Sequence, residues 1–162
     1  MPQPIADVSP PKWHLGHTSW FFEAVFLEKH IPGYKPFHPD FAFIFNSYYE
    51  SFGRRVERPL RGTFSRPTMG EIEKYREYTN RRMCELIDSI DASQWSEFEH
   101  LVVLALNHEQ QHQELLVTDL KFILSCNPTR PPYSLDLAFQ SISETPPKMS
   151  FVPFPGGLHE IG

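Results

Sequence analysis

Two histidines four residues apart carry the strongest chemical signal in the chain, within the sequence NHEQQHQE. Side chains at positions i and i+4 of an α-helix lie one above the other on the same face, so His108 and His112 would bring two imidazoles together. The same face should be apolar above and below the pair, because three leucines fall within about 40° of His108: Leu101, Leu104 and Leu115. Imidazoles on such a face need partners, and two that converge predict half of a metal site.

The residues around this pair leave several interpretations open. Gln111 and Asp119 lie close to the same face, which favours a site, whereas Glu114 lies about 120° away and is not expected to ligate. Paired histidines also occur on ordinary solvated helices, so a pair without a metal is one alternative. Another is a zinc protease, because His108 and His112 belong to a literal His-Glu-x-x-His motif. The absence of strand patterns before this helix argues against that class.

A third ligand has to come from another segment, and the sequence WHLGH offers two histidines. His17 shares an apolar helical face with Trp13 and Trp20. His14 lies roughly 60° round the same helix, so we prefer His17. Gly16 would let another segment approach closely. Three neutral imidazoles leave positions open on a metal, which suits zinc hydrolysis or dioxygen chemistry at iron(II), and ligand type alone does not choose between them.

Four helices could position these side chains. Between residues 40 and 127 the only prolines are Pro59 and Pro67, and long helices tolerate proline poorly except in the first turn. Capping residues and apolar spacing predict four helices: from an N-cap at Ser9 to before Pro32, over about 40–52, from a capping box at Thr68 to about Ile90, and over about 94–124 after an N-cap at Ser93. This pattern indicates an all-α, antiparallel four-helix bundle with an irregular C-terminal tail.

The composition limits the class of protein. With 162 residues, 40% hydrophobic and 22% charged, the chain should fold as a globular domain. Its net charge of −5 argues against a nucleic-acid-binding protein. Cys84 and Cys126 are too few for a disulfide framework and are expected to be small buried hydrophobes. We expect no signal peptide and no membrane span, and hence a cytoplasmic location without a membrane partner.

Longer stretches of the sequence resemble a known family. SPPKWHLGHTSWFFE (residues 9–23) resembles the opening helix of the ergothioneine-biosynthesis sulfoxide synthases, also called hercynine oxygenases. HEQQHQELL (108–116) resembles their His-x-x-x-His-x-Glu motif, and FNSYYE (45–50) and SRPT (65–68) are also similar to the family. These matches follow one another in the family's order over nearly the whole chain, which is more specific than any single motif.

The resemblance implies a DinB-like bundle that holds mononuclear non-haem iron(II) through His17, His108 and His112, with zinc or nickel possible in purified protein. Enzymes of this family use O2 to join the sulfur of a cysteine-containing thiol, gamma-glutamylcysteine or cysteine, to the imidazole C2 of hercynine, giving a sulfoxide. The glutamine before the second histidine of the motif contacts hercynine in the family, which here points to Gln111.

Basic residues gather in the long connection from Gly53 to Pro67. The substrates' carboxylates need cationic partners, and we expect one of the arginines in this connection to bind the carboxylate of the thiol. The candidates are Arg55, Arg61 and Arg66. Any single one of them could instead be a solvated loop residue.

The resemblance also predicts a second domain. Family members continue into a domain related to the formylglycine-generating enzyme, which supplies a catalytic tyrosine. We therefore expect a metal-binding bundle over residues 1–130, a linker over 131–147, and the first strand of a truncated second domain over 148–162, so that the chain alone would be inactive. The alternatives are an ovothiol-type synthase that couples cysteine to histidine, a stand-alone DinB-like thiol transferase using zinc or nickel, and a non-enzymatic bundle.

Overall fold

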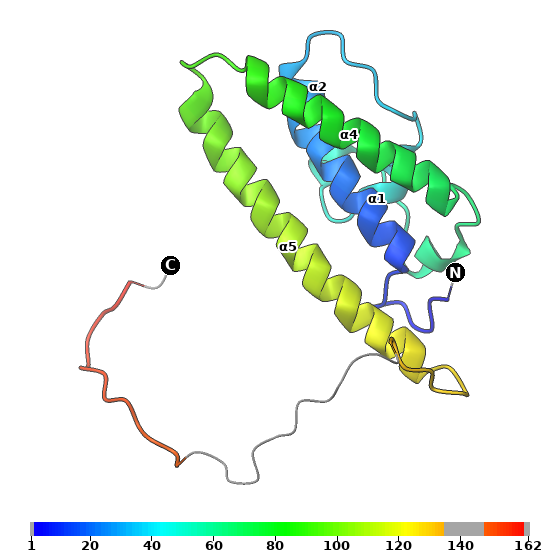
Figure 1. Cartoon of the computed structure of the whole chain (residues 1–162), viewed down its shortest axis with the longest axis vertical. Coiled ribbons are helices and arrows are strands. Elements are labelled where there is room, and N and C mark those ends of the chain that lie inside the picture. Colours follow the sequence, from blue (N-terminus) through cyan, green and yellow to red (C-terminus); the bar gives the residue numbers. More distant parts are fainter. Residues whose placement is uncertain (1, 135–147, 161–162) are drawn as a thin grey trace.

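A computed structural model of the chain describes residues 2–134 and 148–160, which contain five α-helices and no strand (Figure 1). The α-helices are α1 (Pro11–Phe22), α2 (Glu28–His30), α3 (Phe41–Phe45), α4 (Met69–Ser89) and α5 (Trp95–Ser125). A π-helical segment, η1 (Glu23–Leu27), joins α1 to α2, and two 3-10 segments, η2 (Glu50–Phe52) and η3 (Arg58–Thr63), separate α3 from α4. The all-helical prediction is confirmed for these residues, but the count of four helices is not.

The first helical rod runs without a break from α1 through η1 to α2. Pro10 rather than Ser9 occupies the N-cap position, and Pro11 begins the helix, where a missing N–H costs no hydrogen bond. Within η1 the buried carboxylate of Glu23 accepts hydrogen bonds from the hydroxyls of Tyr34 and Tyr75. This carboxylate therefore ties the rod to the following loop and to α4.

The second predicted helix, over about 40–52, is wrong in length, because α3 ends at Phe45. Asn46 adopts an extended backbone conformation, with φ −62° and ψ 142°. Its buried side-chain amide donates to the carbonyl oxygen of Tyr49 at 3.0 Å, so it stabilises a turn in place of another helical turn. The end of α3 leaves the carbonyl of Phe45 free for a partner outside the helix.

The third and fourth predicted helices agree with α4 and α5 to within a residue or two. Thr68 and Glu71 form the predicted capping box at the start of α4. At the start of α5 the N-cap is Gln94 instead of Ser93, because the hydroxyl of Ser93 bonds to Asp91 at 2.7 Å. Apart from this N-cap, capping residues and apolar spacing predicted the first and last residues of α4 and α5 closely.

The core lies where α1 contacts both α4 and α5 (Figure 1). It contains large side chains that are less than 2% exposed: Trp20, Phe26, Phe45, Tyr75 and Phe98. α3 is held close to α1 because Gly16 has no side chain. A Cβ atom at this position would lie 2.3 Å from the Phe45 ring, so the predicted close approach at Gly16 is confirmed.

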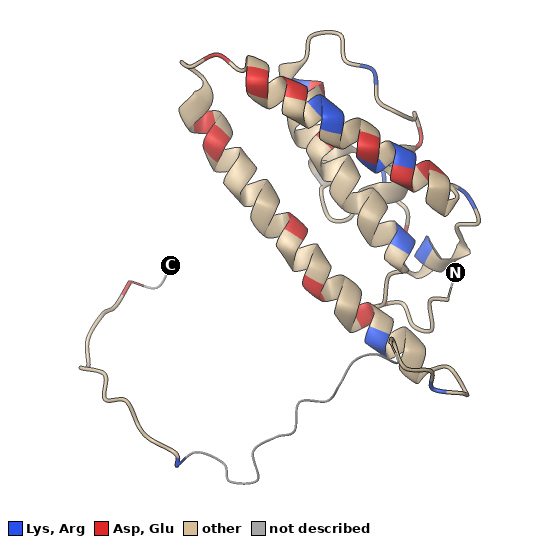
Figure 2. Cartoon of the chain, viewed as in Figure 1, with Lys and Arg blue, Asp and Glu red and all other residues tan. Residues whose placement is uncertain are grey.

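Among the described residues, α5 is covered on one side only, which corrects the expected burial of its leucines. Leu104 and Leu115, predicted to flank the histidines on a buried face, are 56% and 40% exposed. The buried side of α5 is centred on Ala105 and Asp119, a fraction of a turn away. In Figure 2 the ribbon colours mark many charged residues along α4 and few in the middle of α5. Cys84 and Cys126 are exposed and not buried as expected.

The C-terminal part leaves the predicted domain boundaries untested. Residues 148–160 form no strand, and a strand would need a neighbouring strand to pair with, which the described residues do not provide. Most of the predicted linker, residues 135–147, and the last two residues lie outside the described part of the chain. None of the described helices is long and apolar enough to cross a membrane.

Candidate metal centre

His17 lies on the buried side of α1, with a ring held from two directions. Its Nδ1 atom is 2.6 Å from the carbonyl oxygen of Phe45, and the ring stacks on Trp13 with centroids 4.7 Å apart and an interplanar angle of 10°. Because a carbonyl only accepts hydrogen bonds, Nδ1 is the donor. The lone pair of His17 is therefore on Nε2, away from Phe45.

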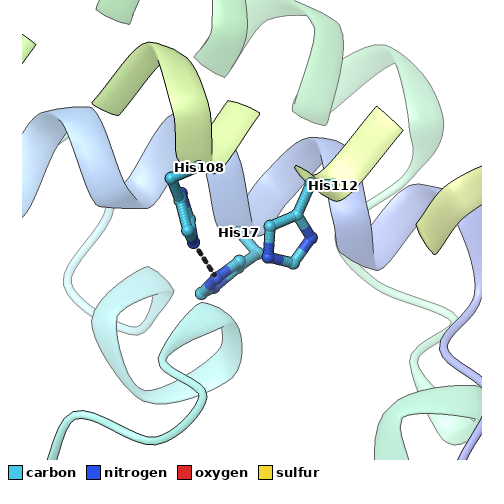
Figure 3. A group of neighbouring side chains, drawn as sticks. All are labelled: His17, His108 and His112. Carbon is cyan, nitrogen blue, oxygen red and sulfur yellow. Dashed lines mark hydrogen bonds between the residues drawn. The ribbon is translucent and has the colours of Figure 1, made fainter. Parts of the chain in front are cut away.

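His108 and His112 reach the same point from α5. The Nε2 atoms of His17 and His108 are 3.3 Å apart, and the ring of His108 stacks on Phe21 with centroids 4.1 Å apart. The centroid of the His112 ring is 4.5 Å from that of His17 and 4.6 Å from that of His108. Figure 3 shows the three rings converging, with one nitrogen of His112 directed toward His17 and the other away from it.

These three histidines can hold a metal ion. Each offers one nitrogen, and the three nitrogens lie within 4.8 Å of one another. No other group of three or more His, Cys, Asp or Glu side chains in the described residues has this geometry. A divalent ion is consistent with the arrangement, because neutral imidazole is a common ligand of zinc, iron, copper and nickel.

Burial keeps all three rings neutral. It holds the pKa of His17 well below the usual 6.5, and the neighbouring His112 adds to the effect. Burial also lowers the pKa of His108, and it lowers the pKa of His112, together with the nearby His108 and His14, to about 3. Neutral imidazole is the form that binds metals, so the site needs no deprotonation near neutral pH.

His14 and Asp119 lie directly behind His112. The Nδ1 atoms of His14 and His112 are 3.0 Å apart, and the Nε2 atom of His14 is 2.9 Å from the carboxylate of Asp119. The same carboxylate oxygen accepts the main-chain N–H of Ser9 at 2.8 Å. The group of nitrogens that could hold an ion thus includes His17 and not His14, and the contact between His14 and His112 was not predicted.

A cavity of about 420 Å³ opens beside the histidines. Its lining includes the polar residues Ser47, Tyr48 and Gln111, together with Trp13 and the three converging rings. The predicted substrate residue Gln111 is exposed and lines this cavity. A molecule bound in the cavity could therefore touch a metal ion and the side chain of Gln111 together.

Arg61 is the buried cation of this cavity. Its guanidinium lies 3.5 Å from the centre of the Trp13 ring and donates to the hydroxyls of Ser9 at 2.9 Å and Ser47 at 3.1 Å. Only 5% of the residue is exposed, and in the described part of the chain no carboxylate forms an ion pair with it. Burial lowers the pKa of Arg61 to about 10, so the guanidinium is charged at neutral pH.

The other predicted arginines lie elsewhere. Arg55 lines a neighbouring cavity of about 510 Å³, which also contains Arg58 and Arg61 but none of the histidines. Arg66 is exposed, and its guanidinium donates to the carbonyl oxygen of Ser65 at 3.4 Å. Arg58 belongs to the same predicted cluster of arginines but was not among the three candidates; it lines the histidine cavity and donates to the hydroxyl of Tyr48 at 3.2 Å.

The carboxylates of the motif do not face the centre. Glu109 forms an ion pair with Arg76 at 2.9 Å and does not line the histidine cavity. A zinc protease would need this glutamate beside the metal as a general base, so the structure argues against that class. Glu114 is exposed and also lies outside the cavity, in agreement with the prediction that it does not ligate.

The sequence over residues 2–116 matches the DinB superfamily. The chain belongs to this superfamily. The match covers the first four α-helices and the part of α5 that carries His108 and His112. Members of the superfamily are often metal-dependent enzymes, which agrees with a cluster of three histidines that can hold an ion. No curated protein is significantly similar to the chain.

Proposed function

We propose that this DinB-superfamily chain forms the metal-binding part of a non-haem iron(II) enzyme that uses O2 to join a thiol sulfur to the imidazole C2 of hercynine. The observation that carries the proposal is one cavity lined by three neutral imidazoles and by the buried guanidinium of Arg61, which has no ion-pair partner among the described residues. A metal ion and a substrate carboxylate can meet there. The resemblance of residues 9–23 and 108–116 to the hercynine oxygenases supports this choice of substrates.

The residues present fit a metal ion. Two nitrogens bound tetrahedrally at about 2.05 Å lie about 3.3 Å apart, and the Nε2 atoms of His17 and His108 are 3.3 Å apart. The Nδ1 atom of His108 is buried without a hydrogen-bond partner in the described residues, and its Nε2 atom is the one that faces His17. His17, His108 and His112 would hold iron(II), which would supply the chemistry with O2 and favour the thiolate form of a bound thiol.

The overall reaction balances without another reductant. The C2–H and S–H hydrogens leave with one oxygen atom as water, the other oxygen atom becomes the S=O oxygen, and the C–S bond forms. The protein's part is to bind and orient. Arg61 is placed for a carboxylate, because guanidinium and carboxylate form charge-assisted hydrogen bonds. Gln111, at the exposed side of the cavity, can donate to or accept from an imidazole substrate.

The first test is metal binding and substrate binding, which need no second domain. The purified chain, loaded anaerobically with iron(II), is titrated with gamma-glutamylcysteine, with cysteine and with hercynine by calorimetry. We expect one metal per chain, lost in His17→Ala and His112→Ala, and thiol binding that requires the metal. Unchanged metal content in both variants would overturn the proposed metal site. A chain that binds the metal but none of these three compounds would overturn the proposed choice of substrates.

The second test is turnover. Oxygen consumption and sulfoxide formation are measured with the chain alone and with a formylglycine-generating-enzyme-like domain added. We expect turnover only when the second domain is present, because the resemblance places the catalytic tyrosine there. Competition between histidine and hercynine distinguishes an ovothiol-type synthase. Absence of O2 consumption in the combined assay, with iron and both substrates bound, would count against either oxygenase.

A stand-alone metal-dependent thiol transferase is the second candidate, since three imidazoles at this spacing suit zinc equally well. This function predicts zinc or nickel as the working metal and thiol transfer by the chain alone. Replacement of iron(II) by zinc therefore separates the two candidates, because zinc has no redox chemistry. Thiol transfer by the zinc form without O2 would favour the transferase.

A further inference from the structure

His112 is the last of three side chains that form a hydrogen-bonded chain between α5 and α1. The carboxylate of Asp119 contacts the Nε2 atom of His14 at 2.9 Å, and the Nδ1 atom of His14 contacts the Nδ1 atom of His112 at 3.0 Å. Asp119 and His14 are only 9% and 4% exposed, so water does not replace these contacts. Asp119 and His112 both lie on α5, and His14 on α1 connects them.

The direction of each hydrogen bond in this chain can be worked out. The main-chain N–H of Ser9 can only donate, so the Asp119 oxygen 2.8 Å away is an acceptor, as an ionised carboxylate always is. His14 must then carry its hydrogen on Nε2. A neutral imidazole has one N–H, which leaves Nδ1 of His14 as an acceptor. His112 therefore donates from Nδ1, and its lone pair is on Nε2.

We propose that Asp119 and His14 are positioning residues that fix the tautomer of His112, so that Nε2 of this ring is the metal-binding atom. Figure 3 agrees with this direction, because one nitrogen of His112 points toward His17 while the other points away.

The three rings of the site are therefore held differently. The tautomer of His17 is fixed by the carbonyl oxygen of Phe45, and that of His112 by a carboxylate acting through His14. His108 has no partner at Nδ1 in the described residues, and its Nε2 atom lies 3.3 Å from Nε2 of His17, which carries a lone pair, so in the metal-free chain Nε2 of His108 is the donor. In metal sites, such outer hydrogen bonds commonly change affinity by about 10–100-fold.

The tautomers can be measured in the metal-free protein, by nitrogen-15 NMR of the histidine rings. In the metal-free protein we expect the hydrogen on Nδ1 in His17 and His112, and on Nε2 in His14 and His108. The role given to these tautomers rests on the proposed metal site, but the NMR measurement does not require a bound metal. A hydrogen on Nε2 of His112 in the metal-free protein would overturn it.

Two substitutions of Asp119 separate hydrogen bonding from charge. Asp119→Asn removes the charge but keeps an oxygen that can accept from Ser9 and His14, whereas Asp119→Leu removes the acceptor. We expect Asp119→Asn to keep the His112 tautomer and most of the affinity for Zn²⁺. Asp119→Leu should place hydrogen on Nε2 of His112 and weaken Zn²⁺ binding by about 10–100-fold. The control for lost charge is Asp88→Leu, at an exposed position on α4.

The outcomes distinguish the two proposals. Equal loss of Zn²⁺ affinity in both Asp119 variants would assign the effect to charge and overturn the tautomer inference. Should Asp119→Leu fail to fold, His14→Phe removes the acceptor of the His112 N–H, and the same tautomer change and loss of affinity are expected. The expected tautomers in a protein that binds no metal would leave this inference standing and overturn the proposed metal site alone.

Discussion

The carbonyl oxygen of Phe45 lies 2.6 Å from the Nδ1 atom of His17, although 28 residues separate them in the chain. The contact exists because α3 ends at Phe45 and because the ring of the same residue packs directly over Gly16 on α1. One residue thus supports the core with its side chain and orients a candidate ligand with its main chain. The structure links the packing of α3 to the geometry of the metal centre.

Gly16→Ala should disturb both the core and His17. The added Cβ would lie 2.3 Å from the Phe45 ring, so Phe45 has to move, and overpacking of this kind costs about 1–3 kcal/mol. Urea unfolding measures the loss of stability. Gly70→Ala is the matched control, since a Cβ there meets nothing within 4 Å, and it should be neutral or stabilise α4 by up to about 1 kcal/mol. Equal stability of both variants would contradict the role of Gly16.

A smaller residue at position 45 should partly restore the Gly16→Ala variant. Phe45→Leu removes the ring atoms nearest to the new Cβ, although it also loses packing in the core. We therefore expect the double variant to be more stable than the sum of the two single changes implies, by about 0.5–3 kcal/mol. Additive effects would show that Phe45 and Gly16 do not interact in this way.

A divalent metal should stabilise the folded chain through the three histidines. An ion that binds only the folded form adds about 2.7 kcal/mol when its concentration is 100 times the Kd. Thermal unfolding with and without Zn²⁺ or Co²⁺ measures this effect. We expect His108→Ala to lose most of it and His100→Ala, at an exposed position on α5, to keep it. Equal stabilisation of both variants would place the metal elsewhere.

The position of Arg61 predicts that its replacement weakens binding of a substrate carboxylate without weakening metal binding. Charge-assisted hydrogen bonds contribute about 1.5–3 kcal/mol, so Arg61→Met should weaken binding of gamma-glutamylcysteine to the metal-loaded chain on the order of 10–100-fold. Metal binding should change little, because the three ligands are untouched. Arg66→Met is the control, since Arg66 is exposed and lies outside the cavity. A larger effect at Arg66 than at Arg61 would instead assign the substrate carboxylate to Arg66.

Local patterns predicted the parts of the site that lie on one helix. The pairing of His108 and His112 and the exclusion of Glu114 follow from helical periodicity, which depends only on sequence spacing. The capping box at Thr68 and the close approach at Gly16 were also predictable, because each reflects a local requirement. His17 came from its apolar helical face and from a family resemblance.

Tertiary packing decided the rest. The early end of α3 depends on the Asn46 side chain and on a partner for the Phe45 carbonyl, neither of which periodicity reveals. The exposure of Leu104 depends on which side of α5 meets α1. His14 is one turn from His17 and carries no local sign of its contact with His112, which arises only when the two helices pack. Similarly, the arginines of one basic connection look alike in sequence, but burial separates Arg61 from Arg66.

Acid should destabilise the metal-free chain as its buried histidines are protonated on unfolding. The usual pKa of histidine is 6.5, and that of His112 in the folded chain is about 3, while the pKa of His17 is also lowered. Between these values the unfolded chain binds more protons than the folded one, so the free energy of unfolding falls as the pH falls and is fully retained only above about 6.5.

Urea unfolding between about pH 7 and pH 5, above the range where most carboxylates titrate, measures how the free energy of unfolding changes with pH. We expect His112→Gln to reduce the slope and His100→Gln to leave it unchanged, whereas a flat profile in the unsubstituted chain would show that these rings are not buried in the neutral form.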